Sequence, residues 1–545
     1  MQAFSGASGK GSALEQTTLP TARRTHASDG NGYQKHLDEK ISPLTTAHAQ
    51  SAPSLLTNRD RNAIALLIVL YFIQGIPIGL AFGSIPFLLK SRLSYTQIGT
   101  FSLSTYPYSL KLFWSPIIDS VYHPQIGRRK SWIVPIQAIL GSLMIWMGRN
   151  SEELLKSAEH DISKLTFVFV TLVFFAATQD IAVDGWALTL LSGKNLSYAS
   201  TAQTVGLNSG YFLSFTVFLA LNSPEFANKY FRAVPSAEPF LNLGGYLKFW
   251  GYFCFVVTLW LFFFKREDPV SAEEEDTDIS VRGVYRTMWK ICQLKQIQTL
   301  VIIHLVAKIG FQANDAATDL KLMEKGLLTR EDLALVALID FPLQLVGGWV
   351  AARWSTGDHK LRPWLQGYVV RLAFALASVG LVKGFNAEDA KSRWLLLLII
   401  VVKVLTSFAS TFQFVGVSAF HTHISDPVVG GTYMTLLNTI SNLGGTWPRW
   451  FVLTGVDVFS SAMCHVNEST REISCFHPAQ ECSSESGRER CKGLGGECVT
   501  EFDGYYTVSL ICVALGAILL VGYIWPKAKQ LQALPLSSWR VNMSK

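Results

Sequence analysis

The chain has 545 residues, of which 49% are hydrophobic and only 16% are charged. A soluble enzyme carries about a quarter charged residues, and a disordered chain has low hydrophobicity, so this composition excludes both classes. A net charge of +7 without a strongly basic domain argues against nucleic acid as a partner. Because a transmembrane helix needs roughly 20 mostly apolar residues, the chain could form about twelve of them. We therefore expect an all-α polytopic membrane protein.

The first 60 residues are rich in Ser, Thr, His, Gln and Gly, and their apolar residues are not clustered. Such a stretch cannot bury enough surface to offset chain entropy, so we expect residues 1–60 to form a disordered cytosolic tail. The stretch lacks the apolar core and small-residue cleavage site of a signal peptide. The first hydrophobic span is therefore expected to act as the insertion signal.

Long apolar runs recur from Ala63 onward and predict twelve spans. Eleven is the main alternative, because the fifth run is polar and rich in glycine. The runs lie at 63–83, 99–119, 131–148, 165–190, 202–221, 248–264, 297–314, 333–351, 365–384, 394–417, 433–456 and 503–525. They predict two six-helix bundles, 61–264 and 297–526, joined by an acidic cytosolic linker at 265–296 and followed by a cytosolic tail at 527–545.

Basic residues near the span ends indicate the orientation in the membrane. Three basic groups fall on one side if both termini are cytosolic, although the opposite loops also carry some basic residues. These groups are Arg128, Arg129 and Lys130; Arg353, Lys360 and Arg362; and Lys527 and Lys529.

The loop at 457–502 contains five of the eight cysteines: Cys464, Cys475, Cys482, Cys491 and Cys498. No Cys-x-x-Cys pair occurs among them, which argues against zinc and favours disulfides in an oxidising lumen. Because five is odd, at least one of these thiols stays free or pairs elsewhere. Asn467 begins an Asn-Glu-Ser glycosylation acceptor in the same loop. Both features place the loop on the lumenal side, and we expect no metal and no cofactor.

Two acidic residues, Asp180 and Asp184, lie in the fourth span. Their four-residue spacing places both carboxylates on one helix face. A charged residue at a helix centre costs about 2.5–3.5 kcal/mol, so such residues mark transport pathways or pair with one another. One interpretation makes them a coupling site or gate, and the other makes them structural partners of Lys or Arg on neighbouring helices.

Four cations, Lys111, Lys308, Arg371 and Lys403, lie inside or at the ends of other spans. Together they could line a cavity that attracts an anion. The alternative is that their long side chains reach the membrane interface, which suits Lys111 and Lys403 best. Lys308 lies in mid-span and is followed by Asp315, a further candidate for gating or coupling.

The eleventh span combines glycines and a proline with the polar or amphipathic residues Tyr433, Asn438, Asn442 and Trp447. Interrupted helices at membrane depth often line substrate cavities. Polar packing between helices is the alternative. No nucleophile motif is present, so we expect no catalytic residue.

Two sets of residues carry a resemblance to known families. Asp119, followed by Gly127, Arg128, Arg129 and Lys130, resembles the 2–3 loop signature of the major facilitator superfamily, although the gap after the aspartate is longer here. More specifically, the chain resembles the acetyl-coenzyme A transporters of the endoplasmic reticulum membrane, solute carrier family 33. The matching segments are 109–119, 127–132, 176–192, 307–311, 425–447 and 491–506.

This resemblance implies a multi-pass protein of the endoplasmic reticulum that imports acetyl-coenzyme A for lumenal protein and glycan acetylation. Alternating access is expected, with the basic cluster at 128–130 as the cytosolic gate. Exchange for free coenzyme A and proton coupling through the fourth-span acids both stay open. We hypothesise that Lys308, Arg371 and Lys403 supply charge to the ligand. Aromatic faces would come from Tyr433, Trp447 and Trp186.

Two other functions stay open at this point. One is a carrier for a different bulky organic anion. The other is a membrane-embedded acetyltransferase that passes only the acetyl group across, for which His304 is the only deep histidine.

Overall fold

The computed structural model describes residues 57–90, 92–123, 125–192, 195, 198–267, 281–354, 361–386, 392–425, 430–466, 487, 490–491, 493 and 496–540. These residues belong to one compact unit. Several predictions lie outside the described residues: most of the N-terminal tail, the acidic run of the linker, Cys475, Cys482 and Asn467.

Each of the twelve predicted spans falls on a helix or on a run of short helices. In the first half (residues 57–267) the helices are α2 (Asn58–Gly79) continued by η1 (Leu80–Ser84) and α3 (Ile85–Lys90); α4 (Tyr95–Ser102), η2 (Leu103–Thr105), α5 (Tyr106–Leu110), η3 (Lys111–Phe113) and α6 (Ser115–Ser120); α7 (Lys130–Arg149); α8 (Ser151–Ser157); α9 (Ile162–Leu190); α10 (Tyr198–Phe212), η5 (Leu213–Val217) and α11 (Phe218–Leu221); α12 (Pro224–Tyr230); and α13 (Leu243–Phe264).

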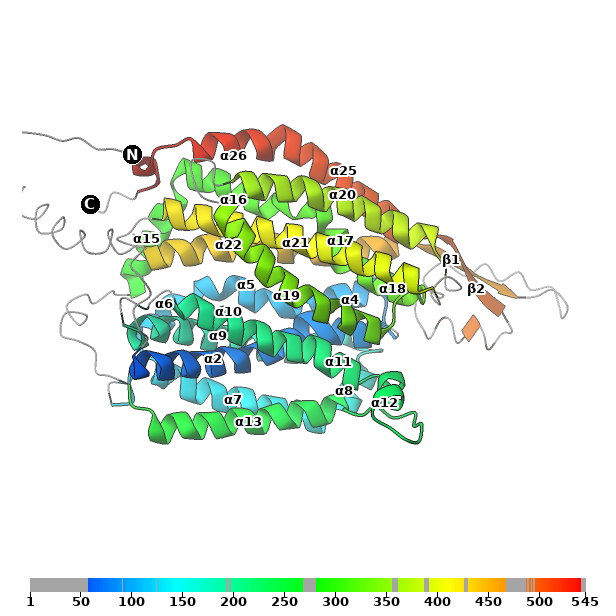
Figure 1. The fold of residues 1–545 in the computed structure, drawn as a ribbon, viewed down its shortest axis with the longest axis horizontal. Coiled ribbons are helices and arrows are strands. Elements are labelled where there is room, and N and C mark those ends of the chain that lie inside the picture. The colour runs from blue at the N-terminus through cyan, green and yellow to red at the C-terminus, as the bar shows by residue number, and fades with distance from the viewer. Residues whose placement is uncertain are drawn as a thin grey trace, which may run out of the picture. The chain divides into compact units, whose positions relative to one another are not determined.

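The second half (residues 281–540) repeats this plan. Its elements are α15 (Val281–Cys292); α16 (Lys295–Ala307), η6 (Ile309–Phe311), α17 (Gln312–Ala316) and α18 (Thr318–Glu324); α19 (Arg330–Trp354); α20 (Arg362–Gly384); α21 (Arg393–Ile424); α22 (Gly430–Val458); β1 (Ser461–Val466) and β2 (Gly496–Phe502); α25 (Gly504–Leu519), η8 (Leu520–Ile524) and α26 (Trp525–Gln532); and η9 (Leu536–Trp539). The two strands pair antiparallel. The two halves meet along α22, which packs against α4 and α5 (Figure 1).

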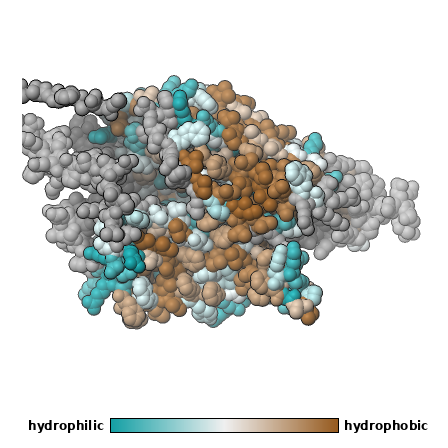
Figure 2. Space-filling view, viewed as in Figure 1, coloured by the Kyte–Doolittle hydropathy of each residue, from teal (hydrophilic) through white to brown (hydrophobic). Residues whose placement is uncertain are grey.

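The surface of the helical body suits a hydrocarbon environment. Among the described residues, nine helical segments are long and apolar enough to cross a membrane. The other three predicted spans are the interrupted run α4–α6, α19 and the polar helix α22. Hydrophobic residues cover much of the middle of the visible face (Figure 2), and large apolar side chains such as Phe167, Phe264 and Val521 are more than two-thirds exposed. Such exposure is stable only against lipid.

Close contact between α2 and α10 depends on glycine. A Cβ atom added at Gly210 would lie 2.2 Å from the carbonyl oxygen of Phe72. We expect Gly210→Ala to force the helices apart and destabilise the protein by about 1–3 kcal/mol. Thermal unfolding in detergent measures this change. Gly380→Ala is the matched control, because a Cβ there has no atom within 4 Å; equal losses of Tm in both variants would contradict the interpretation.

Parts of the predicted linker and C-terminal tail are helical and packed. In the linker, α15 buries Met288 and Ile291. In the tail, Trp539 is only 1% exposed, and its carbonyl accepts a hydrogen bond from the Tyr433 hydroxyl at 3.0 Å. Both segments are packed because a few of their apolar side chains are buried against the second half.

Candidate functional site

The two acids of the fourth span share one lysine. Lys111 in η3 forms an ion pair with Asp180, and its Nζ lies 3.7 Å from Asp184. The Tyr108 hydroxyl donates to Asp180 at 3.2 Å, and the Tyr71 hydroxyl donates to Asp184 at 2.7 Å. This geometry corresponds to the ion-pair interpretation of the two acids, and their role in coupling stays a prediction.

Arg371 in α20 is held from three sides. One terminal nitrogen lies 2.5 Å from Asp315 of α17, and the other donates to the Gln413 side chain at 2.8 Å. Its guanidinium carbon lies 3.6 Å from the ring centroid of Phe311. The sequence predicted Arg371 as a contact for the ligand. It did not predict that Asp315 and Gln413 would be its partners within the protein.

Lys403 in α21 forms an ion pair with Asp319 of α18. Three of the four cations predicted from the sequence, Lys111, Arg371 and Lys403, therefore have a carboxylate partner within the protein. Buried ion pairs of this kind neutralise charge that the bilayer would otherwise exclude.

Lys308 differs from these three. It lies at the junction of α16 and η6, and its side chain runs over Gly445 of α22: a Cβ atom at Gly445 would lie 3.2 Å from Lys308 Nζ. Within the described residues, no carboxylate lies at ion-pair distance from this ammonium. Glycine at position 445 leaves room for the lysine chain between the two helices.

Arg449, one turn beyond Gly445 on α22, is a fifth interior cation that the sequence interpretation missed. Its Nε is buried and has no hydrogen-bond partner in the described part of the chain, nor does the guanidinium form an ion pair there. Tyr211 of α10 and Asp315 of α17 lie within electrostatic range of it. The sequence feature that could have indicated Arg449 is an arginine inside the predicted span 433–456, four residues after Gly445.

Together these contacts make a positively charged cluster where the halves meet. Asp315 is the carboxylate that interacts with Lys308, Arg371 and Arg449, so three cations share one anion. The adjoining α5–α22 contact is polar, with the hydroxyls of Ser109 and Thr446 2.8 Å apart. Such a cluster can bind an anionic group such as a phosphate.

The aromatic and amide residues predicted to contact a ligand lie in several environments. Trp186 and Tyr433 are at most 1% exposed and pack in the core, so neither presents a ring face here. The Trp447 indole donates to the Leu305 carbonyl at 2.8 Å. Asn438 bonds His421 at 3.1 Å, and Asn442 is exposed on α22. Their roles in binding stay predictions.

The basic cluster at 128–130 has its contacts within the first half. Arg129 forms an ion pair with Asp119 at 2.6 Å, so the longer gap after the aspartate does not prevent this contact. Arg128 Nε donates to the Asp119 carbonyl at 2.8 Å. Glu267, after α13, accepts from the backbone N–H groups of Arg129 and Lys130. The cluster thus joins α6, α7 and the end of α13; its predicted role as a gate stays untested.

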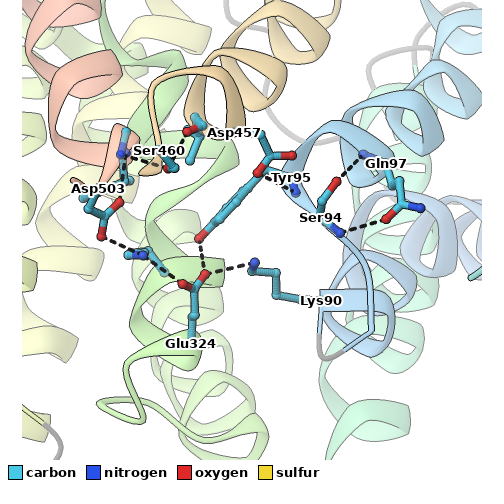
Figure 3. A network of polar contacts seen from close by, with 12 residues as sticks. Lys90, Ser94, Tyr95, Gln97, Glu324, Asp457, Ser460 and Asp503 are labelled. Carbon is cyan, nitrogen blue, oxygen red and sulfur yellow. Dashed lines mark hydrogen bonds and ion pairs between the residues drawn. The ribbon is translucent and has the colours of Figure 1, made fainter. Parts of the chain in front are cut away.

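At the opposite end of the bundle, a buried network joins the two halves (Figure 3). Glu324 of α18 lies 2.9 Å from both Lys90 and Lys321, and it accepts a hydrogen bond from the Tyr95 hydroxyl at 2.9 Å. Lys321 also pairs with Asp503 at 2.7 Å. Lys90 and Tyr95 belong to the first half, whereas the three other residues belong to the second.

Asp457, near the end of α22, adds a second link at this end. Its carboxylate accepts from the backbone N–H groups of Tyr95 at 3.3 Å and of Thr96 at 2.5 Å (Figure 3). An acid at this position satisfies free N–H groups and the positive end of the α4 dipole. We name Lys90, Tyr95, Glu324 and Asp457 the cross-half latch. Its partners lie far apart in the chain, so the sequence alone does not reveal it.

The described part of the cysteine-rich segment (457–502) includes the latch residue Asp457 and the strands β1 and β2. A disulfide joins Cys464 and Cys491, and Cys498 is also disulfide-bonded. Asp503, which pairs with Lys321, follows directly after β2.

Comparison with known proteins agrees with this architecture. The family model "Acetyl-coenzyme A transporter 1" matches residues 63–275, 270–362 and 357–541. "Uncharacterized membrane protein YBR220C" of Saccharomyces cerevisiae is 42% identical, with 89% of this chain and 98% of that protein covered. "Uncharacterized protein C21B10.09" of Schizosaccharomyces pombe is 41% identical, with 91% and 92% covered.

A solved structure shares the fold. It is a bacterial homologue of the human lysosomal transporter Spinster in an inward-facing, unoccupied conformation, with a TM-score of 0.57 and 13% identity over 88% of this chain and 98% of that chain. The chain therefore belongs to the acetyl-coenzyme A transporter 1 family, and it is a multi-pass membrane transporter of the major facilitator fold.

Proposed function

We propose that the protein carries acetyl-coenzyme A from the cytosol into the lumen of the endoplasmic reticulum and so supplies lumenal protein and glycan acetylation. Family membership supports this substrate. The structural observation that carries the proposal is the pair Lys308 and Arg449. In the described residues, both are interior cations without a carboxylate at ion-pair distance. Lys308 lies against Gly445 of α22, and Arg449 of α22 lies within electrostatic range of Tyr211 in the first half.

The chemistry of the ligand fits this pair. Acetyl-coenzyme A carries several phosphate charges, and a guanidinium offers a planar fork to two phosphate oxygens at once. A lysine contributes a compact charge that adapts to the remaining oxygens. Because the site lies at membrane depth, the attraction is screened less than it would be in water.

Transport is proposed to follow alternating access, with the two halves rocking about this cluster. The cross-half latch holds the halves together at the end that carries the cysteine-rich segment. The charged groups at 119–130 bond within the first half here, and they are proposed to approach the second half in another state of the cycle. Net flux down the acetyl-coenzyme A gradient, exchange for free coenzyme A, and proton coupling through Asp180 or Asp184 are the alternatives for energising transport.

The acetyltransferase alternative is disfavoured by the environment of His304. Its Nε2 lies 2.8 Å from Nε2 of His421, and the two side chains are 3% and 0% exposed. An imidazole that is buried and bonded to a second imidazole is not open to an incoming thioester.

The test uses the purified full-length protein in sealed liposomes with acetyl-coenzyme A labelled in both the acetyl and the adenine portions. We expect both labels to enter in equal amounts. Acetyl label entering alone would support the transferase, and entry of neither label would overturn the proposed substrate. Liposomes preloaded with unlabelled coenzyme A, compared with empty ones, separate exchange from uniport.

A further inference from the structure

The exposed side of α15 is not part of the proposed transport site. The opposite side of this helix is docked: Met288 and Ile291 are at most 8% exposed and pack in the core of the second half. The Tyr285 hydroxyl donates to the carbonyl of Phe113, which belongs to the first half. These contacts hold α15 firmly and determine which of its residues point away from the bundle.

The outward side of α15 carries two arginines and a tryptophan. Arg282 and Arg286 are both exposed, and Trp289 is 68% exposed. The spacing of four and then three residues puts these side chains on one helix face. A basic face that also exposes an indole is typical of helices that lie in a membrane interface, where the ring sits at headgroup level and the cations meet lipid phosphates.

The position of α15 agrees with this composition. The helix ends at Cys292, and the membrane-spanning segment Lys295–Glu324 begins directly after it. It also contacts α6 and α22. Because α15 is so close to the start of a span, it lies at the level of the bilayer surface.

We propose that α15 binds the anionic phospholipid headgroups of the surrounding bilayer, with Arg282 and Arg286 on the phosphates and Trp289 inserted at headgroup level. Basic residues near an anionic leaflet each strengthen binding by roughly fivefold, so the two arginines together are worth about 25-fold. The interior location of Lys308 and Arg449 keeps this surface separate from the cluster between the halves, so the proposal goes beyond the transport function.

The test places the full-length protein in nanodiscs that contain brominated phosphatidylserine or brominated phosphatidylcholine, which quench nearby indoles. The difference between the wild type and Trp289→Phe isolates the signal of this tryptophan among the 15 of the chain. We expect brominated phosphatidylserine to quench this signal several-fold more strongly than brominated phosphatidylcholine, and we expect high salt to remove the preference.

Arg282→Gln combined with Arg286→Gln is expected to abolish the preference, whereas the charge-keeping Arg282→Lys with Arg286→Lys retains it. Lys229→Gln with Lys383→Gln is the matched control, because it removes two exposed cations elsewhere on the surface. Equal quenching by the two lipids in the wild type would overturn the proposal. An unchanged lipid preference in the double glutamine variant would also overturn it.

Discussion

Arg449→Gln and Lys308→Gln are each expected to weaken acetyl-coenzyme A binding by about 10- to 100-fold, because a hydrogen bond to a charged group contributes about 1.5–3 kcal/mol. Neither residue has a carboxylate partner at ion-pair distance within the described residues, so no internal ion pair is lost with it. Initial uptake rates over a range of substrate concentrations, at matched protein content in liposomes, measure the effect as a rise in KM or a fall in kcat/KM.

The loss of activity in these two variants should not be accompanied by a loss of stability. Lys308, Arg371 and Arg449 all interact with one acid, Asp315, and Lys308 is also close enough to Arg371 for the two cations to repel each other. Removing one surplus cation is therefore expected to leave the thermal stability of the ligand-free protein unchanged or raised. Functional sites commonly keep unpaired charges that lower the stability of the ligand-free protein, because the bound ligand supplies the missing opposite charge.

Lys403→Gln is the matched comparison for this first prediction. Lys403 has its own counter-charge, Asp319, so its loss leaves a carboxylate uncompensated at membrane depth and is expected to destabilise the protein. Adding Asp319→Asn should restore stability. Wild-type KM in both Lys308→Gln and Arg449→Gln would contradict the proposed site, even if uptake of acetyl-coenzyme A by the wild type were established.

Glu324→Gln is expected to open the end of the bundle that carries the cysteine-rich segment. The substitution removes the negative charge shared by Lys90 and Lys321, whose side chains are each only 8% exposed. Removing one partner of a buried ion pair costs about 3–5 kcal/mol, because the other charge is left uncompensated. Because Lys90 meets Glu324 only when the halves are joined, most of this cost falls on the joined state, and the equilibrium shifts by about 100-fold or more toward the separated one.

Hydrogen exchange of the peptide containing Tyr95 and Thr96 measures this shift. The backbone N–H groups of these residues donate to Asp457 of the second half, so separation of the halves exposes them to solvent. Glu159→Gln is the matched control. It breaks the Arg92–Glu159 pair, whose side chains are 48% and 42% exposed, and exposed pairs are worth about 0–1 kcal/mol. Unchanged exchange in Glu324→Gln would show that the latch does not hold the halves together.

The helical architecture was predictable from the sequence because the hydrophobic requirement for a membrane span is local. Even the polar run at 202–221, which made eleven spans the alternative, lies on the helices α10–α11. The family resemblance rested on long matched segments and is confirmed by the family model. Packing of Ile291 and Trp539 was not predictable, because isolated apolar residues in a linker or tail do not reveal which surface they will cover.

The candidate site shows where local information ends. The cost of burying a charge singled out Lys111, Lys308, Arg371 and Lys403, with Lys308 set apart only by its position in mid-span. The sequence could not distinguish the paired cations from the unpaired one, because each partner lies on a different helix. Tyr433 was chosen for its ring, yet it is fully buried in the core of the second half, and its hydroxyl bonds the carbonyl of Trp539 near the far end of the chain.

By itself, then, the amino-acid sequence determined that this chain is a helical membrane transporter of an acetyl-coenzyme A transporter family, since hydrophobic length and matched segments are properties of contiguous residues. Only the tertiary structure decided which interior cations lack a counter-charge and which residues form the buried latch between the halves. Both outcomes depend on separations of a few ångströms between side chains from distant helices, and at membrane depth such separations decide whether a charge is neutralised or left for a ligand.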